Sequence, residues 1–286
     1  PYAVKLYNDI IYVDLPESLK TLIYPLQEHQ AREVESIQRM GFMGSVKNLT
    51  SRIITEAQQS VSRAISRRDK RGYNAARKIS DIRRMHMLLD LLKTQGVKAG
   101  LAFLEKAESE GRSGDRGTNR FLSQPVIHNF RINASDLGEL HPKAEIVSEM
   151  VRTKIDENPH SRILIFTEYR YTVRNLTESL ANIDGVKVSQ FIGQSTSGKQ
   201  KGMTQREQLT RLEEFRSGAV NVLVATSVGE EGLDVPAAEL VLMYEPVPSA
   251  IRSIQRRGRT ARQSSGTVKT LVAKDTRDQF VSHAAK

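Results

Sequence analysis

Three residues near the C-terminal end of the chain, Gln255, Arg259 and Arg262, have the types and spacing needed to grip a phosphate. Residues three and four apart lie on one side of a helix, so these polar side chains would be presented together. A guanidinium keeps its charge and donates two parallel hydrogen bonds to phosphate oxygens. Such an arginine can accelerate phosphoryl transfer by roughly 10³ to 10⁵. Taken alone, the three residues also fit a solvated basic helix end, where arginine suits the helix dipole.

A second element of the candidate phosphate site precedes this helix. Val222 to Ala225 is typical of a buried strand, and it is followed by Thr226-Ser227 and by a glycine-bearing acidic turn that contains Gly232 and Asp234. Short hydroxyl residues and glycines let backbone N–H groups approach a phosphate, while Asp234 would accept from a ribose hydroxyl. A purely structural turn explains the glycines but not the whole arrangement.

The pattern of residues 136–286 predicts how these elements are positioned. Strands are expected at five short apolar runs, Arg162–Phe166, Val186–Ile192, Val220–Ala225, Leu240–Tyr244 and Thr267–Ala273. Helical segments lie between them, and Thr204 with Glu207 forms a capping-box pattern for a helix that Gly218 closes. Strands alternating with helices indicate an α/β fold, a parallel sheet covered on both faces. Ligands bind outside the carboxyl ends of such strands, so the loops after the first four strands should form one functional rim.

The segment before the sheet is expected to be all helical. A short strand is predicted over Ile10–Leu15, and a helix over Glu17–Arg39 with a kink or break at Pro25. Two long amphipathic helices that pack together are predicted between Leu49 and Leu92, and a shorter helix around Val97–Glu110. Residues 110–119 are rich in Gly, Ser, Arg and Asp and are expected to be an exposed loop. The predicted domains are therefore 1–15 as a linker or strand, 16–135 as a helical domain and 136–286 as the α/β domain.

The helical segment carries most of the positive charge. The chain has a net charge of +10, and residues 16–135 hold 21 Lys and Arg against 12 Asp and Glu, a net of +9. A localised positive surface favours a polyanionic partner, because phosphate contacts release counterions. The candidate contacts at the centre of this basic region are Arg63, Arg67, Arg68, Lys70 and Arg71. The alternative is a solvated helical face with no partner.

Several classes of protein are disfavoured by composition. The chain has no cysteine, and its six histidines show no ligand-like spacing, so disulfides, thiolate catalysis and a metal site of its own are not expected. No apolar run approaches the ~20 residues that cross a bilayer, and the N-terminus lacks the apolar core of a signal peptide. A cytoplasmic protein without a membrane partner is expected, nucleoid-associated if the source is archaeal. The absence of an initiator methionine indicates a piece of a longer chain.

The motifs resemble those of superfamily 2 helicases. ATSVGEEGLDVP, from Ala225, and QRRGRTAR, from Gln255, are similar to motifs V and VI, and IFTEY, from Ile165, is similar to motif IV. FIGQSTSGKQKGMTQREQ, from Phe191, resembles one group in particular, archaeal Hef and its eukaryotic relative FANCM. A long basic helical insertion ahead of the second motor domain also fits that group. The motif-bearing resemblance covers Ser135 to Ala273.

The resemblance implies a RecA-like second motor domain preceded by a thumb-like all-α insertion. It implies that Arg259 and Arg262 are arginine fingers on the γ-phosphate of ATP, with Gln255 positioning water or phosphate, and that Gly232 and Asp234 lie at the nucleotide edge. The nucleic-acid track along the rim would be lined by Thr167, Arg170, Gly193, Gln194, Thr226 and Ser227. The basic insertion would grip duplex or branched DNA.

The sequence lacks a phosphate loop and a DExH box, which a superfamily 2 motor uses to hold ATP and Mg²⁺. Gly193-x-x-x-x-Gly198-Lys199-Gln200 approaches the phosphate-loop pattern, but Gln200 replaces the Mg²⁺-binding Ser or Thr, so it is interpreted as a decoy. Asp156-Glu157 is interpreted as surface charge at a helix end. ATP and Mg²⁺ would be held mainly by a first RecA-like domain, and this chain alone should not hydrolyse ATP.

The predicted function is that of the C-terminal half of an ATP-dependent DNA helicase or translocase acting on forked or branched DNA. Its expected partners are that DNA and the first RecA-like domain of the same protein, and whether a nuclease domain follows Lys286, as in archaeal Hef, is left open. A structure-selective nucleic-acid binding module is one alternative. An RNA-directed helicase is another, because the RIG-I and Dicer helicases share a similar Glu-Glu-Gly-Leu-Asp motif.

Overall fold

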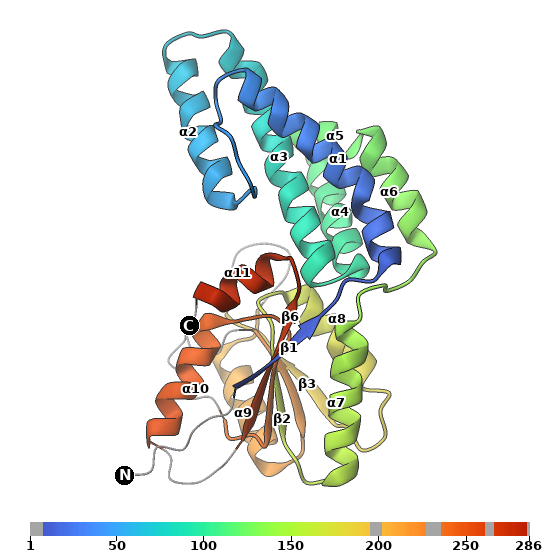
Figure 1. The fold of residues 1–286 in the computed structure, drawn as a ribbon. Coiled ribbons are helices and arrows are strands. Elements are labelled where there is room, and N and C mark those ends of the chain that lie inside the picture. The colour runs from blue at the N-terminus through green and yellow to red at the C-terminus, as the bar shows by residue number, and fades with distance from the viewer. Residues whose placement is uncertain (1–7, 195–201, 227–235, 261–265, 285–286) are drawn as a thin grey trace. The chain divides into compact units, whose positions relative to one another are not determined.

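The computed structural model describes residues 8–194, 202–226, 236–260 and 266–284, with the backbone alone at residue 8 and at 255–260. The chain divides into two compact units, one made of Pro1–Asp14 with Pro142–Lys286 and the other of Leu15–His141. Figure 1 shows a sheet with helices in the first unit and helices alone in the second. None of the described helices has the length and apolar character that crossing a membrane requires.

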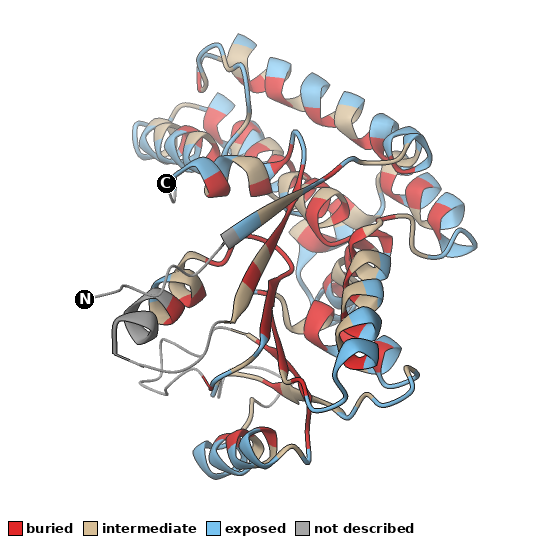
Figure 2. Cartoon of the chain, turned by 60° about the horizontal axis from the view of Figure 1, so that its bottom comes forward, coloured by how far each residue is buried: buried red, intermediate tan, exposed pale blue. Residues whose placement is uncertain are grey.

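The first unit is built on a six-stranded sheet in the order β1-β6-β5-β2-β4-β3, and every neighbouring pair is parallel. The strands are β1 (Asn8–Val13), β2 (Ile163–Phe166), β3 (Val188–Phe191), β4 (Val222–Ala225), β5 (Leu240–Met243) and β6 (Thr267–Ala273). Every residue of β2, β4 and β5 is buried, as the red central strands of Figure 2 show. Burial on both faces explains why these strands are continuous apolar runs. The predicted α/β class is confirmed.

Helices cover both faces of this sheet. They are α7 (Lys143–Glu157), α8 (Arg170–Leu180), α9 (Gln205–Ser217), α10 (Pro248–Thr260) and α11 (Arg277–Ala284). The helices α7 and α8 bury Val151 and Leu176 in one core, while α9 and α10 bury Phe215 and Ala250 in the other. Thr204 and Glu207 form the predicted capping box at the start of α9, and Gly218 ends the helix in a left-handed conformation.

The first strand belongs to the sheet, which corrects the predicted separation of residues 1–15 from the α/β domain. Strand β1 pairs with β6, from Asn8 opposite Val268 to Val13 opposite Ala273. Val13 is buried in the same core as α7 and α8. The hydrogen bonds to β6 and the burial of Val13 hold residues 8–13 in the sheet. The partner strand β6 lies near the other end of the sequence, so local sequence patterns do not reveal this pairing.

The second unit consists of α1 (Glu17–Arg39), α2 (Ser51–Ser66), α3 (Arg71–Thr94), α4 (Val97–Arg112), α5 (Arg116–Leu122) and α6 (Pro125–Ser135). The long helices α1 and α3 contribute to two cores, one shared with α2 around Ile54 and one shared with α4, α5 and α6 around Phe121. The predicted pairing of the two amphipathic helices is confirmed by the packing of α2 on α3. At their junction, a Cβ on Gly72 would lie 2.7 Å from Cγ1 of Ile65, so glycine permits the close approach.

Helix α1 runs through Pro25 without the predicted break. Pro25 is exposed, whereas Leu19, Ile23 and Leu26 are buried on the opposite side of the helix. Burying each such side chain stabilises by about 1.5 to 3 kcal/mol, which together outweighs the ~3 kcal/mol cost of an interior proline.

The stretch 110–119 is also more ordered than predicted. Helix α4 extends to Arg112, and α5 begins at Arg116. Asp115 caps α5 by accepting hydrogen bonds from the N–H groups of Gly117 at 2.9 Å and Thr118 at 3.2 Å. Hydrogen bonds from Thr118 hold the pKa of this carboxyl below its ordinary value. The fully buried Phe121 provides the apolar anchor that the polar composition of the stretch obscures.

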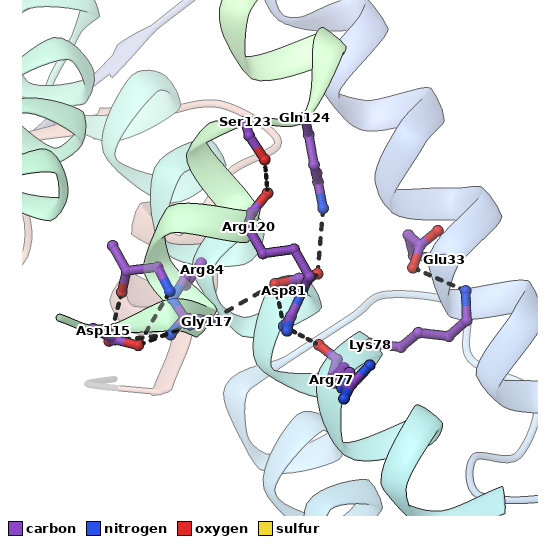
Figure 3. A network of polar contacts seen from close by, with 11 residues as sticks. Glu33, Arg77, Lys78, Asp81, Arg84, Asp115, Gly117, Arg120, Ser123 and Gln124 are labelled. Carbon is purple, nitrogen blue, oxygen red and sulfur yellow. Dashed lines mark hydrogen bonds and ion pairs between the residues drawn. The ribbon is translucent and has the colours of Figure 1, made fainter. Parts of the chain in front are cut away.

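A buried carboxylate ties the helical unit together. Asp81 of α3 accepts from the guanidinium of Arg120 at 3.2 Å and from the side-chain amide of Gln124 at 3.2 Å (Figure 3). It therefore joins α3 to α5 and to the residue that precedes α6. The unit also continues beyond the predicted boundary at Ser135, because Glu139 accepts from the N–H of Val97 at 2.8 Å and so caps α4.

Candidate nucleotide and nucleic-acid site

The predicted rim lies where β2, β3 and β4 end together. Phe166 is in register with Ala225, and Phe191 is in register with the same Ala225. On the other side, Phe166 is in register with Met243 of β5. The residues that follow these four strands are therefore at one edge of the sheet, as expected for a parallel α/β fold.

Three of the six predicted track residues are linked to one another by hydrogen bonds at this edge, and a fourth, Gln194, is tied to the same loop through Gln208. The guanidinium of Arg170, the first residue of α8, donates to the carbonyl of Gly193 at 3.1 Å. The N–H of Gly193 donates to Oγ1 of Thr226 at 3.2 Å, and the N–H of Thr226 donates to the carbonyl of Phe191 at 3.0 Å. Gln194, which follows directly, is exposed. One hydrogen-bonded rim cluster thus holds Arg170, Gly193, Gln194 and Thr226.

Gln208 of α9 supports this rim cluster and was not predicted. It is fully buried, and its side-chain amide donates to the carbonyl of Ile192 at 3.0 Å. Its Oε1 accepts from the side-chain amide of Gln194 at 3.1 Å. The available sequence signal was that Gln208 is the last residue of the Hef-like stretch that begins at Phe191. Gln208 fixes the end of β3 and orients Gln194.

Thr167, which was predicted to line the nucleic-acid track, joins two of the loops at the rim. Its side chain is fully buried, and its hydroxyl hydrogen-bonds Glu245 at 2.9 Å. Glu245 follows β5, is also buried, and accepts from the N–H of Glu168 at 2.5 Å. Thr167 therefore fastens the loop after β2 to the loop after β5. This contact positions the segment from which Arg170 extends.

The helix that carries the predicted arginine fingers is α10. Gln255 and Arg259 lie in it four residues apart, and Ala250 and Ile254 anchor the helix in the core beside the sheet. Arg262, Ser227, Gly232 and Asp234 lie outside the described residues. The helical spacing expected for Gln255 and Arg259 is thus present in the backbone.

The phosphate-loop decoy is described only in part, and the acidic pair at the end of α7 is described in full. Gly193 belongs to the rim cluster, whereas Gly198, Lys199 and Gln200 lie outside the described residues. Asp156 and Glu157 are exposed at the C-terminal end of α7, just ahead of β2 and so at the opposite edge of the sheet from the rim. Among the described residues there is no group of three or more His, Cys, Asp or Glu that could hold a metal ion.

In the second unit the predicted basic contacts gather where α2 passes to α3. We call Arg63, Arg67, Arg68 and Lys70 the basic turn; all four are exposed, and their side chains make no hydrogen bond or ion pair with the described residues. Arg71 differs, because its guanidinium pairs with Asp69 at 2.8 Å and lies 5.8 Å from the ring centroid of Phe42. The hydrogen bond from Arg71 holds the pKa of Asp69 below its ordinary value. Arg71 is therefore engaged within the protein.

Arg68 occupies a backbone conformation that favours glycine, with φ of 61°. It follows the end of α2, where the N–H of Arg68 bonds the carbonyl of Ile65 at 2.9 Å and that of Asp69 bonds Ala64 at 3.0 Å. This bonding is the Schellman motif, in which the left-handed residue is usually glycine. The left-handed conformation costs an L-residue about 1 to 2 kcal/mol.

Replacing Arg68 by glycine is therefore expected to stabilise the helical unit by up to about 1 kcal/mol, after allowing for the extra freedom of glycine in the unfolded chain. Urea unfolding followed by circular dichroism would measure the change. A lower midpoint than that of the native chain would mean that the Arg68 side chain stabilises the turn and is not free for a partner.

Comparison with known proteins agrees with this geometry. Residues 142–264 match the model of the helicase conserved C-terminal domain. This segment is a helicase C-terminal domain with the superfamily 2 fold, and it is homologous to the helicases named FANCM, Mph1 and Hef.

Three relatives illustrate the similarity. The crystal structure of the Pyrococcus furiosus Hef helicase domain matches with a TM-score of 0.83 and 34% identity, over 100% of this chain and 59% of that one. A Methanocaldococcus jannaschii protein whose name reads ATP-dependent RNA helicase is 32% identical over 285 residues, 100% of this chain and 36% of its own. The ATP-dependent DNA helicase mph1 of Neurospora crassa is 37% identical over 147 residues, 50% of this chain and 13% of its own. The chain thus spans about a third or less of the length of the M. jannaschii and N. crassa proteins.

Proposed function

We propose that the chain is the second motor domain and helical insertion of an ATP-dependent DNA helicase or translocase that acts on forked or branched DNA. The observation that carries the proposal is the rim cluster, in which Arg170, Gly193 and Thr226 are joined across the ends of β2, β3 and β4. Such an edge places a hydroxyl and a guanidinium side by side, and these are groups that contact a phosphodiester backbone.

On the nucleotide side, we propose that Arg259 and Arg262 reach the γ-phosphate of ATP held by a first RecA-like domain, with Gln255 beside them. Gly232 and Asp234 would lie at the nucleotide edge. The anchoring of α10 by Ala250 and Ile254 supports a rigid mounting for this group. Mg²⁺ would be bound with ATP by the first domain.

On the nucleic-acid side, Arg170, Gly193, Gln194, Thr226 and Ser227 would follow one strand, with Thr167 positioning the first of them through Glu245. The basic turn would contact phosphates of the DNA. In this proposal the rim moves along the DNA strand, and the helical unit adds affinity for the DNA.

The contact between the basic turn and DNA is tested by changing all four residues to alanine and measuring the binding of fluorescent forked DNA at several salt concentrations. Each lost phosphate contact should lower the slope of log K against log salt by about 1, with weaker binding at every salt concentration.

A matched control removes four other exposed cations from the same unit, Lys20, Arg39, Arg52 and Arg112, each already beside a carboxylate. This control should bind forked DNA nearly as the native chain does. Equal losses in the two variants would contradict a specific role for the basic turn.

An RNA-directed helicase is the second candidate, because the M. jannaschii relative is named as an RNA helicase. A competition between forked DNA and double-stranded RNA of equal length separates the two. We expect the DNA to win, and preference for the RNA would reassign the substrate.

A further inference from the structure

One exposed stripe of α3 combines an aromatic ring with unpaired positive charge. Tyr73 and Arg77 of α3 and Lys70, the residue directly before the helix, are all exposed and lie three and four residues apart, hence on one side of the helix. Tyr73 is 62% exposed, more than any other large apolar or aromatic side chain among the described residues. With a rise of about 1.5 Å per residue, Tyr73 and Arg77 are roughly 6 Å apart along the axis, close to the spacing of successive nucleotides.

The positive charge of this stripe is not compensated locally. Nearby carboxylates are already engaged. Asp69 pairs with Arg71 at 2.8 Å. Figure 3 shows the other two pairs, Glu33 with Lys78 at 3.4 Å and Asp81 with Arg120 at 3.2 Å. The side chains of Lys70 and Arg77 make no ion pair with any described residue. The field beside the Tyr73 ring is therefore positive.

Tyr24 of α1 provides the internal contrast. It is 58% exposed, but its hydroxyl donates to Glu28 at 3.0 Å, so its surroundings are acidic. Tyr73 has no such acidic partner in the described part of the chain. A tyrosine bordered by a carboxylate is poorly placed beside a polyanion, whereas one bordered by a lysine and an arginine is well placed.

The support beneath Tyr73 is rigid. The preceding residue is Gly72, where the missing Cβ lets Ile65 of α2 pack closely against α3. Ala75 and Ile79 are buried in the same core on the opposite side of the helix. An aromatic ring on a fixed helix loses little freedom when a partner binds, which favours affinity.

We propose that Tyr73 stacks on an unpaired base of the DNA while Lys70 and Arg77 contact the flanking phosphates, so that the stripe recognises the single-stranded arm next to a fork junction. Stacking of bases on aromatic side chains between cationic groups is how proteins hold single strands without sequence preference. The inference rests on the proposed DNA-binding function and adds to it a residue that distinguishes unpaired from paired DNA.

The test uses this chain with Tyr73→Ala, Tyr73→Phe and the control Tyr24→Ala, on forked DNA and on blunt duplex of equal length. Removing the ring should weaken fork binding about 10-fold, within the range for one stacked base, and leave duplex binding and the salt slope unchanged. Tyr73→Phe and Tyr24→Ala should bind the fork as the native chain does. Arg77→Ala should instead lower the salt slope by about 1.

A direct readout is 2-aminopurine placed at the first unpaired position of an arm, whose fluorescence the native chain should quench and Tyr73→Ala should not. Unchanged fork affinity in Tyr73→Ala, or equal losses on fork and duplex, would overturn the stacking role and leave the DNA-binding proposal standing. Failure of the native chain to bind either DNA would overturn both.

Discussion

In a protein that carries both motor domains, Arg259→Ala and Arg262→Ala should each reduce DNA-stimulated ATP turnover by roughly 10³ to 10⁵. The reason is electrostatic: the guanidinium is positioned in advance where negative charge develops on the transferred phosphoryl group, in a site that excludes water. The backbone of α10 supports this prediction, since it continues through Arg259 from the buried residues Ala250 and Ile254. Steady-state phosphate release at saturating DNA measures the loss.

Arg216→Ala is the matched control for this prediction. Arg216 is exposed in the last turn of α9, ahead of β4 and therefore at the edge of the sheet away from the rim. Its removal should leave ATP turnover within about 2-fold, in keeping with the small effect of most surface changes. Full turnover in both finger variants would show that the arginines act elsewhere.

The second large effect concerns the buried ion pair of the α/β unit. Nζ of Lys143 lies 2.6 Å from Oδ2 of Asp278, and the two side chains are 0% and 5% exposed. The same oxygen accepts from the N–H of Ala273, and the ammonium lies 5.2 Å from the ring centroid of Tyr244. The pair therefore ties α7 and α11 to the ends of β5 and β6.

Lys143→Met should destabilise the chain by about 3 to 5 kcal/mol at neutral pH, because it leaves the Asp278 carboxylate buried without its cation. Urea unfolding would measure the loss, and Arg152→Met on the exposed side of α7 should change stability by less than about 0.5 kcal/mol. A small effect of Lys143→Met would mean that water or another donor reaches Asp278.

The same variant should respond to pH in a defined direction. Burial raises the pKa of Asp278, and the ammonium of Lys143 opposes that rise. Without Lys143 the pKa of Asp278 in the folded state rises further above its pKa in the unfolded chain. Protonation of Asp278 therefore stabilises the folded variant as pH falls, and this stabilisation is lost as pH rises through the folded-state pKa. The difference between native chain and variant should therefore shrink in acid.

Much of this fold was predictable because local and long-range preferences agree. The runs that became β2, β4 and β5 are apolar throughout, and the capping box at Thr204 with Gly218 as a closing residue specified α9 at both ends. The rim followed from the rule that parallel strands present their carboxyl ends together.

The predictions that failed depended on contacts distant in sequence. Strand β1 joins the sheet through β6, and α1 continues through Pro25 because buried side chains outweigh the local cost. Thr167 was predicted to line the track because it lies in the motif IV stretch, and its burial against Glu245, which follows a strand far along the chain, could not be read from that motif. The supporting role of Gln208 likewise required knowing that α9 lies beside the end of β3.

We propose that this chain supplies one half of a DNA-dependent motor. Its most direct test compares ATP turnover, with and without forked DNA, by this chain alone and by a protein in which a first RecA-like domain precedes it. We expect no turnover by the chain alone, and we expect turnover in the two-domain protein that rises when forked DNA is added. Hydrolysis by the chain alone, or turnover in the two-domain protein that ignores DNA, would contradict it.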